Sequence, residues 1–175
     1  HVSTYRSGGI IEDNSLRSTD ARGLYITKSN EVTLTSNNFE SDNLGGIYIT
    51  DAHNNTFTNN TATAPSQYGT HVHSSTGNTL IEHNSSGVRG IYFSDMSNNT
   101  LLRDCTYISG SSYDLYVSGG TKNINISLIN CSYNTSKENV SGDENYLIRQ
   151  WYYDARVLWN QTGSGLGGAI LTITN

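Results

Sequence analysis

Carboxylate side chains are the first residues to consider for chemistry, because sugar-cleaving enzymes use two of them as acid and base or nucleophile. Asp51 and Asp95 follow equivalent segments of an internal repeat, with Ser74 at the same position in the copy between them. Two repeats of a stacked fold separate the two carboxylates by roughly 10 Å, a spacing that an inverting pair can have. Solvated aspartates at strand ends explain the pattern without catalysis, and we expect a protein that is not an enzyme.

Histidines are the next candidates, because two imidazoles on one face can bind a metal ion. His71 and His73 project from the same side of a predicted strand. A metal site needs at least a third ligand, and His53 and His83 fall at other positions of the repeat. The sequence therefore predicts a pair of solvated surface histidines, no metal site and no cofactor.

Cys105 and Cys131 lie in matching contexts, Asp-Cys-Thr and Asn-Cys-Ser. Adjacent rungs of a stacked fold place equivalent Cα atoms near ~5 Å, within the range of a disulfide. In an exported protein this pair predicts a disulfide bridge. The alternative is two reduced cysteines that stack as small apolar fillers.

Aromatic residues recur at the outward centre of one repeated segment, and they are predicted to stack in one exposed column: Tyr25, Tyr48, His71, Tyr92 and Tyr116. Such a column can pack laterally against another subunit, or its flat rings can bind sugars. The remaining alternative is stacking that only stabilises the sheet. Of the two functional alternatives, lateral packing suits a surface with 12 tyrosines and little charge better.

The elements that position these residues follow from the repeat. Five segments are related in sequence, and their first residues lie 23, 23, 21 and 24 residues apart: Gly23–Thr27, Gly46–Thr50, Gly69–His73, Gly90–Ser94 and Asp114–Ser118. A second β-like motif trails the first in each copy, and both alternate apolar and polar residues with period 2. This pattern predicts a right-handed parallel β-helix of about six rungs of ~22 residues.

Three regions are expected along the chain. Residues 1–134 form the parallel β-helix, residues 135–150 a linker or loop, and residues 151–175 a short two-strand, hairpin-like segment. That segment is predicted as part of a sandwich or as an end cap. The first residues match the middle of a later rung, so we expect an open, uncapped helix end there.

The composition excludes some partners. A net charge of −5 with only 10 basic residues disfavours nucleic acid, and no apolar run is long enough to span a membrane. Asn-x-Ser/Thr motifs are abundant, and those outside the regular repeats are candidates for glycosylation in an extracellular protein: Asn134, Asn139 and Asn160.

The frame Gly-Ile-Tyr-Ile at 46–49, followed by Asn-Asn-Thr-Phe-Thr-Asn-Asn-Thr at 54–61, resembles the β-helix repeats of the pectate-lyase-like superfamily. It is most similar to the NosD-type repeats of methanogen surface proteins, over roughly residues 1–134. The segment that starts at Trp151 resembles the opening of immunoglobulin-like modules. The resemblance implies an archaeal cell-surface protein, with a structural role in a sheath or surface layer as one option.

We therefore expect a non-catalytic extracellular structural protein of the cell envelope. It would assemble as a homo-oligomer or polymer through open helix ends and the tyrosine column, with an envelope glycan as a further partner. The alternative is a carbohydrate-binding or carbohydrate-cleaving β-helix domain of a larger secreted enzyme.

Overall fold

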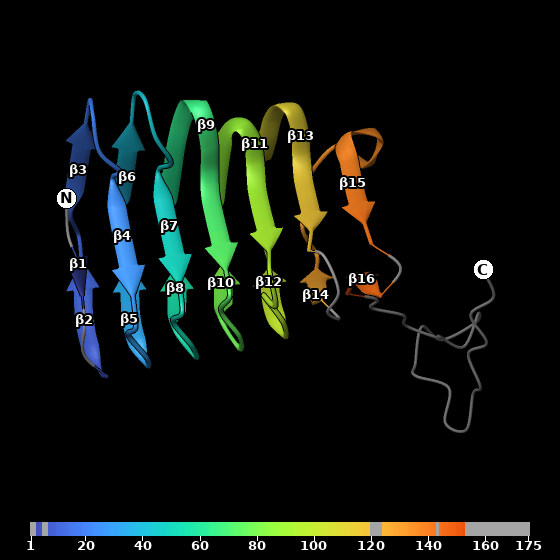
Figure 1. Cartoon of the computed structure of the whole chain (residues 1–175), viewed down its shortest axis with the longest axis horizontal. Coiled ribbons are helices and arrows are strands. Elements are labelled where there is room, and N and C mark those ends of the chain that lie inside the picture. Colours follow the sequence, from blue (N-terminus) through green and yellow to red (C-terminus); the bar gives the residue numbers. More distant parts are fainter. Residues whose placement is uncertain (1–2, 5–6, 120–123, 143, 153–175) are drawn as a thin grey trace, which may run out of the picture.

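The computed structural model describes residues 3–4, 7–119, 124–142 and 144–152, which form a parallel β-helix of about six rungs (Figure 1). A rung is one coil of the chain, and equivalent strands of neighbouring rungs pair in parallel. The all-β parallel β-helix predicted from the repeat is confirmed.

One sheet stacks a strand from each successive rung: β2 (Gly9–Glu12), β5 (Val32–Thr35), β8 (Thr56–Thr58), β10 (Thr79–Ile81), β12 (Thr100–Arg103), β14 (Ile124–Ile129) and β16 (Asn145–Gln150). The second sheet has nine strands and covers two faces of the rod. Its first face contains β3 (Ser15–Ser18), β6 (Asn38–Ser41) and the beginnings of β9 (Thr61–His73), β11 (Asn84–Ser94) and β13 (Ile108–Ser118). Its second face contains β1 (Ser3–Thr4), β4 (Leu24–Thr27), β7 (Ile47–Thr50), the ends of the same long strands and β15 (Glu138–Ser141).

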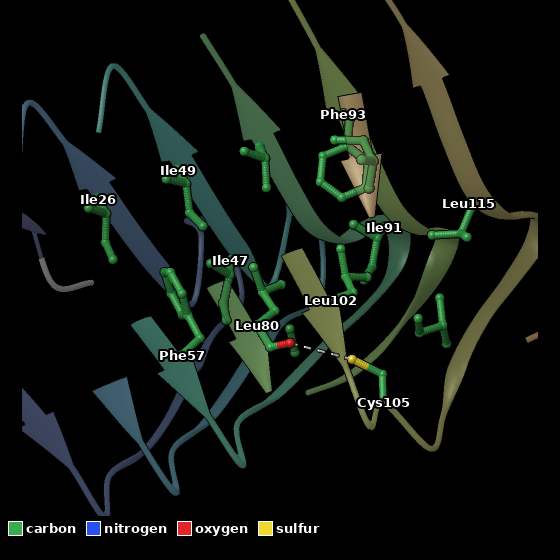
Figure 2. Close-up of a cluster of buried hydrophobic side chains, with 14 of the residues drawn as sticks. Ile26, Ile47, Ile49, Phe57, Leu80, Ile91, Phe93, Leu102, Cys105 and Leu115 are labelled. Atoms are coloured by element: carbon green, nitrogen blue, oxygen red, sulfur yellow. Dashed lines mark hydrogen bonds between the residues drawn. The ribbon is translucent and has the colours of Figure 1, made fainter. Parts of the chain in front are cut away.

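The core is a stack of inward side chains, because alternate residues of every strand point into the coil. On the second face the inward pairs follow the predicted register, for example Leu24 beside Ile47 and Ile91 beside Leu115. These four residues are fully buried. Figure 2 shows this column meeting Phe57 and other apolar side chains from the opposite sheet.

The strands of the first face add a third β segment to the rung, whereas the repeat pattern predicted two. Its inward residues are Phe39, Ala62, Ser85 and Ile108, which share neither size nor polarity. Between the two faces the chain bends at Gly46, where an added Cβ would lie 2.8 Å from the Gly69 carbonyl oxygen. Glycine at this corner lets the rungs approach closely.

A second corner uses residues in the left-handed backbone region. One such residue lies at the same corner of six rungs, with φ between 51° and 55°: Asp13, Ser36, Asn59, Glu82, Asp104 and Asn130. Asn and Asp tolerate this conformation better than most other residues, which explains part of the Asn-rich composition.

Buried asparagines satisfy the backbone next to this corner. The Asn60 side chain donates to the carbonyl oxygens of Leu34 at 2.9 Å and Thr58 at 3.0 Å. Its Oδ1 accepts from both the backbone and side-chain amides of Asn37, each at 2.9 Å. Because each asparagine bonds to the next rung, the amides form a ladder along the rod.

A second amide ladder contains Asn55 and Asn78, whose side chains are joined at 3.0 Å. The repeat spacing alone would predict Asn99 as its next member, 21 residues after Asn78, and that prediction is wrong. Thr79 pairs with Leu101, so Thr100 takes the position beside Asn78, and Asn99 is an exposed residue with φ 53°. Ser94 pairs with His73, 21 residues earlier, whereas Leu101 pairs with Thr79, 22 residues earlier, so one additional residue before β12 shifts the register.

The segment 135–150 was expected as a linker or loop, but its described residues, 135–142 and 144–150, continue the helix to Gln150. After η1 (Thr135–Lys137), β15 pairs with β13 and β16 pairs with β14. The buried Asp114 carboxylate directs this return, because it accepts hydrogen bonds from the backbone amides of Gly110 and Asn134, both at 2.8 Å. The predicted strands of the 151–175 segment lie outside the described residues, apart from Trp151 and Tyr152.

We expect Asn60→Ala to lower the free energy of unfolding by about 2–3 kcal/mol, because the Asn37 backbone amide loses its acceptor and the Leu34 and Thr58 carbonyls each lose a side-chain donor. Urea denaturation followed by circular dichroism measures the loss. Asn43→Ala is the matched control, since the exposed Asn43 makes one side-chain bond, at 3.3 Å to Asp20, and should change stability by less than about 0.5 kcal/mol. Equal losses in both variants would contradict a stabilising ladder.

Candidate functional site

The predicted aromatic column lies on the second face of the nine-stranded sheet. We call its members, Tyr25, Tyr48, His71, Tyr92 and Tyr116, the aromatic strip. Their Cα atoms are partners on β4, β7, β9, β11 and β13. Successive ring centroids are 5.6, 4.8, 4.2 and 5.1 Å apart. The structure therefore brings all five predicted residues together in one row.

A second row flanks the strip, and sequence reasoning missed it. It consists of Arg22, Tyr68, Arg89 and Tyr113, each directly before the first residue of a repeated segment. The Arg22 guanidinium lies 4.2 Å from the Tyr48 centroid, and the Arg89 guanidinium lies 4.5 Å from that of Tyr116. These cation–π contacts hold the two rows together. The sequence does contain a signal for this row, because a basic or aromatic residue directly precedes four of the five repeated segments.

The flanking row has one gap, at Gly45, and the Tyr68 ring fills it. A Cβ on Gly45 would lie 2.4 Å from a ring carbon of Tyr68. The Tyr68 ring also contacts His71 edge to face at a centroid distance of 4.5 Å. Both rows thus form one packed surface.

The arrangement of the rings decides what the strip can bind. His71 and Tyr92 stack with an interplanar angle of 17°, and Tyr25 and Tyr48 with 13°. Ring faces in the strip are largely taken by neighbouring rings and guanidinium groups, so the half-exposed tyrosines present their edges and hydroxyls outward. Stacking of a sugar needs a free ring face, whereas lateral contact with another protein surface does not.

His71 is the middle member of the strip, and His73 follows it on the same strand, with Ser94 and Asp95 on the neighbouring rung. The Ser94 hydroxyl is 2.8 Å from His71 Nε2 and 3.0 Å from His73 Nδ1. Asp95 contacts the same His73 Nδ1 at 3.2 Å. A catalytic triad needs the serine and the carboxylate on opposite nitrogens of one imidazole, and this arrangement does not provide it.

Burial, together with the nearby His73, lowers the pKa of His71 to about 3, so this ring is neutral at ordinary pH. It is 8% exposed, which contradicts the prediction that both histidines are solvated. Asp51 and Asp95 are exposed residues with φ of 50° and 43°. Among the described residues no group of three His, Cys, Asp or Glu side chains could hold a metal ion.

A second buried histidine belongs to the core. His83 follows Asn37 and Asn60 in the asparagine ladder and is fully buried. Its Nε2 lies 2.8 Å from the Thr70 hydroxyl, which accepts from Ser85 Oγ at 3.0 Å. Burial lowers the pKa of His83 to about 4, despite a backbone hydrogen bond with Asn60 that raises it.

Cys105 and Cys131 take the same ladder position on the next two rungs. Both are free thiols in this structure, with Cys105 buried and Cys131 half-buried. A hydrogen bond between the two thiols raises the pKa of Cys105 and lowers that of Cys131. The disulfide between Cys105 and Cys131 therefore stays a prediction, although the two residues do lie on adjacent rungs.

A shallow groove of about 470 Å³ crosses the first face of the nine-stranded sheet. Small residues of three successive rungs form its floor, among them Ser86 and Ser109. Tyr107, which is 57% exposed, and Lys137 line it as well, and the Lys137 ammonium donates to the Gly110 carbonyl oxygen at 2.8 Å. No sequence signal pointed to this groove.

The glycosylation candidates differ in accessibility. Asn134 is exposed and caps η1, with its Oδ1 accepting from the Ser136 amide at 3.0 Å. Asn139 is half-buried and pairs with Tyr116 at the end of the aromatic strip. Asn160 lies outside the described residues. Glycosylation of the three stays a prediction.

Comparison with known proteins agrees with the geometry of the rungs. The family model described as a right handed beta helix region matches residues 1–153. No curated protein matches the chain. In the part of the chain that the structure describes, we find no helix with the length and apolar character needed to cross a bilayer.

We expect the fold to lose stability as the pH falls from about 6.5 toward 4.5, by up to about 1.4 kcal/mol per pH unit for each of His71 and His83. In the folded chain the pKa values of both histidines lie below the ordinary value of 6.5. Between that value and the folded pKa, the unfolded chain therefore binds more protons than the folded chain. Urea unfolding at several pH values measures the slope. His83→Asn, which inserts the residue of the preceding rungs, should reduce it. An unchanged slope in that variant would contradict the role of His83.

Proposed function

This chain belongs to the right-handed β-helix family, and on that basis we propose that it is a non-catalytic structural protein of the cell envelope that associates laterally through the aromatic strip. The family includes enzymes and proteins without activity, so the fold alone does not decide the function. The observation that carries the proposal is the continuity of the strip over five rungs.

The strip has the composition of an interface core. Tyrosine and arginine are enriched at protein–protein contacts, where they bury large areas with few rotatable bonds. Five stacked rungs make a strip roughly 20 Å long, and the flanking row widens it. Cation–π contacts already fix the side chains of Arg22 and Arg89, so a partner would meet a pre-ordered surface.

An extracellular location is part of the proposal and is supported by composition. The surface has few charges, and it carries an exposed sequon at Asn134. The resemblance to repeats of methanogen surface proteins supports an archaeal sheath or surface layer as the assembly. A second copy of the chain is the proposed partner, giving a homo-oligomer or polymer.

We expect the double variant Tyr48→Thr/Tyr92→Thr to weaken self-association at least roughly tenfold, because it removes two central aromatic anchors and keeps the β propensity of their strands. Sedimentation velocity over a range of concentrations measures the association constant. Circular dichroism of the variant verifies that the rungs remain folded.

Tyr107→Thr is the matched control, since it removes an exposed tyrosine outside the strip and should leave association unchanged. A native protein that stays monomeric at high concentration would contradict the proposal. Association that persists unchanged in the double variant would place the interface elsewhere.

A second candidate function, glycan binding, is favoured by the groove beside Tyr107. Unlike the rings of the strip, Tyr107 is mostly exposed, and Ser86 and Ser109 line the same groove. An open aromatic ring with neighbouring hydroxyl groups suits a sugar. We expect Tyr107→Ala to reduce glycan binding at least roughly tenfold on a glycan array or by calorimetry, with the strip variant as control. No binding by the native protein to a broad glycan panel would remove this candidate.

A further inference from the structure

We propose that Cys105 and Cys131 form a thiol–disulfide exchange site, in which Cys131 reacts first with a low-molecular-weight disulfide and Cys105 resolves the adduct into a cross-rung bridge. The inference is independent of the proposed assembly function. It rests on register, on unequal burial and on the residues that precede the pair in its column.

The register brings the two residues to equivalent positions on adjacent rungs. Arg103 pairs with Ile129, and the Ser132 amide donates to the Cys105 carbonyl oxygen at 2.8 Å. Parallel neighbours in such a ladder have Cα atoms ~5 Å apart, within the range that disulfides span. The bridge would link two segments, directly after β12 and β14, that are already joined by a backbone hydrogen bond.

The column shows what the cysteines replace. On earlier rungs, Asn37 and Asn60 each donate a strong hydrogen bond to the carbonyl two residues before, at 3.0 Å. Cys105 makes the equivalent contact at 3.7 Å and Cys131 at 3.5 Å, both from a weak thiol donor. At the last two positions of the ladder, weak thiol contacts therefore replace the hydrogen bonds of the asparagine side chains. A disulfide between the two cysteines would compensate for that loss.

The environments of the two sulfurs differ, which sets the order of reaction. Cys105 is fully buried and its thiol points toward the Leu80 carbonyl oxygen, as Figure 2 shows. Cys131 is half-buried, and the hydrogen bond from the Cys105 thiol lowers its pKa. The thiolate is the nucleophile in exchange, so the accessible Cys131 attacks first.

The chemistry balances with a disulfide as the oxidant. The Cys131 thiolate attacks one sulfur of oxidised glutathione, the glutathione S–S bond breaks, and one glutathione leaves as a thiolate. Cys105 then loses its proton to solvent and attacks the Cys131 sulfur, and the second glutathione leaves. The two cysteine sulfurs are oxidised by two electrons in total, and the glutathione disulfide is reduced to two thiols.

The test uses the full, reduced chain incubated with oxidised glutathione and followed by intact-mass spectrometry. We expect the native chain to lose two hydrogens and keep no adduct. Cys105→Ser should retain one glutathione on Cys131, and Cys131→Ser should gain an adduct at least roughly tenfold more slowly. The oxidised native chain should melt on the order of 10 °C higher than the reduced chain.

Two outcomes would overturn the proposal: a native chain that keeps two free thiols, or equal rates of adduct formation in the two variants. A further measurement on the native chain does not depend on the folding of either variant. Limited alkylation of the reduced native chain, followed by peptide mapping, should label Cys131 before Cys105. Labelling in the reverse order would contradict the assigned roles.

Discussion

The constraint on which this structure depends is that every rung must place its polar groups in register with the next. In a parallel β-helix the backbone bonds and many bonds of the buried amides run along the rod, so these groups find their partners at matching positions of neighbouring rungs. Asn55 shows the rule: its Oδ1 accepts from the Val32 amide one rung away, and its own amide donates to Asn78 on the other side. Apolar stacking then fills the space that this lattice encloses.

This constraint explains which features were predictable from sequence. Inward apolar residues alternate with an outward Tyr or His in the repeated segments, and so the second face and the aromatic strip followed directly from spacing. The first face did not, because Phe39, Ala62 and Ser85 occupy one column with no shared residue type. The strands β15 and β16 were not predicted, because most of their residues are exposed and they lack a regular apolar pattern. Their positions are set by backbone pairing with β13 and β14.

The candidate sites divide along the same line. The strip residues were found because each repeats with the rung, whereas the flanking row alternates arginine, glycine and tyrosine and escaped notice. The groove beside Tyr107 exists because the residues of its floor are small. Small residues are common throughout this Ser- and Gly-rich sequence, so those of the groove do not stand out. The burial of His71 came from the Tyr68 ring, a residue from a different column.

The direction of the ladder bonds has a mechanical consequence. A pull along the rod axis loads one rung boundary at a time, since the outermost rung can peel away while the others stay paired. Each peeled rung of ~22 residues would release roughly 70 Å of chain. Each rod could therefore lengthen stepwise under axial tension, one rung at a time.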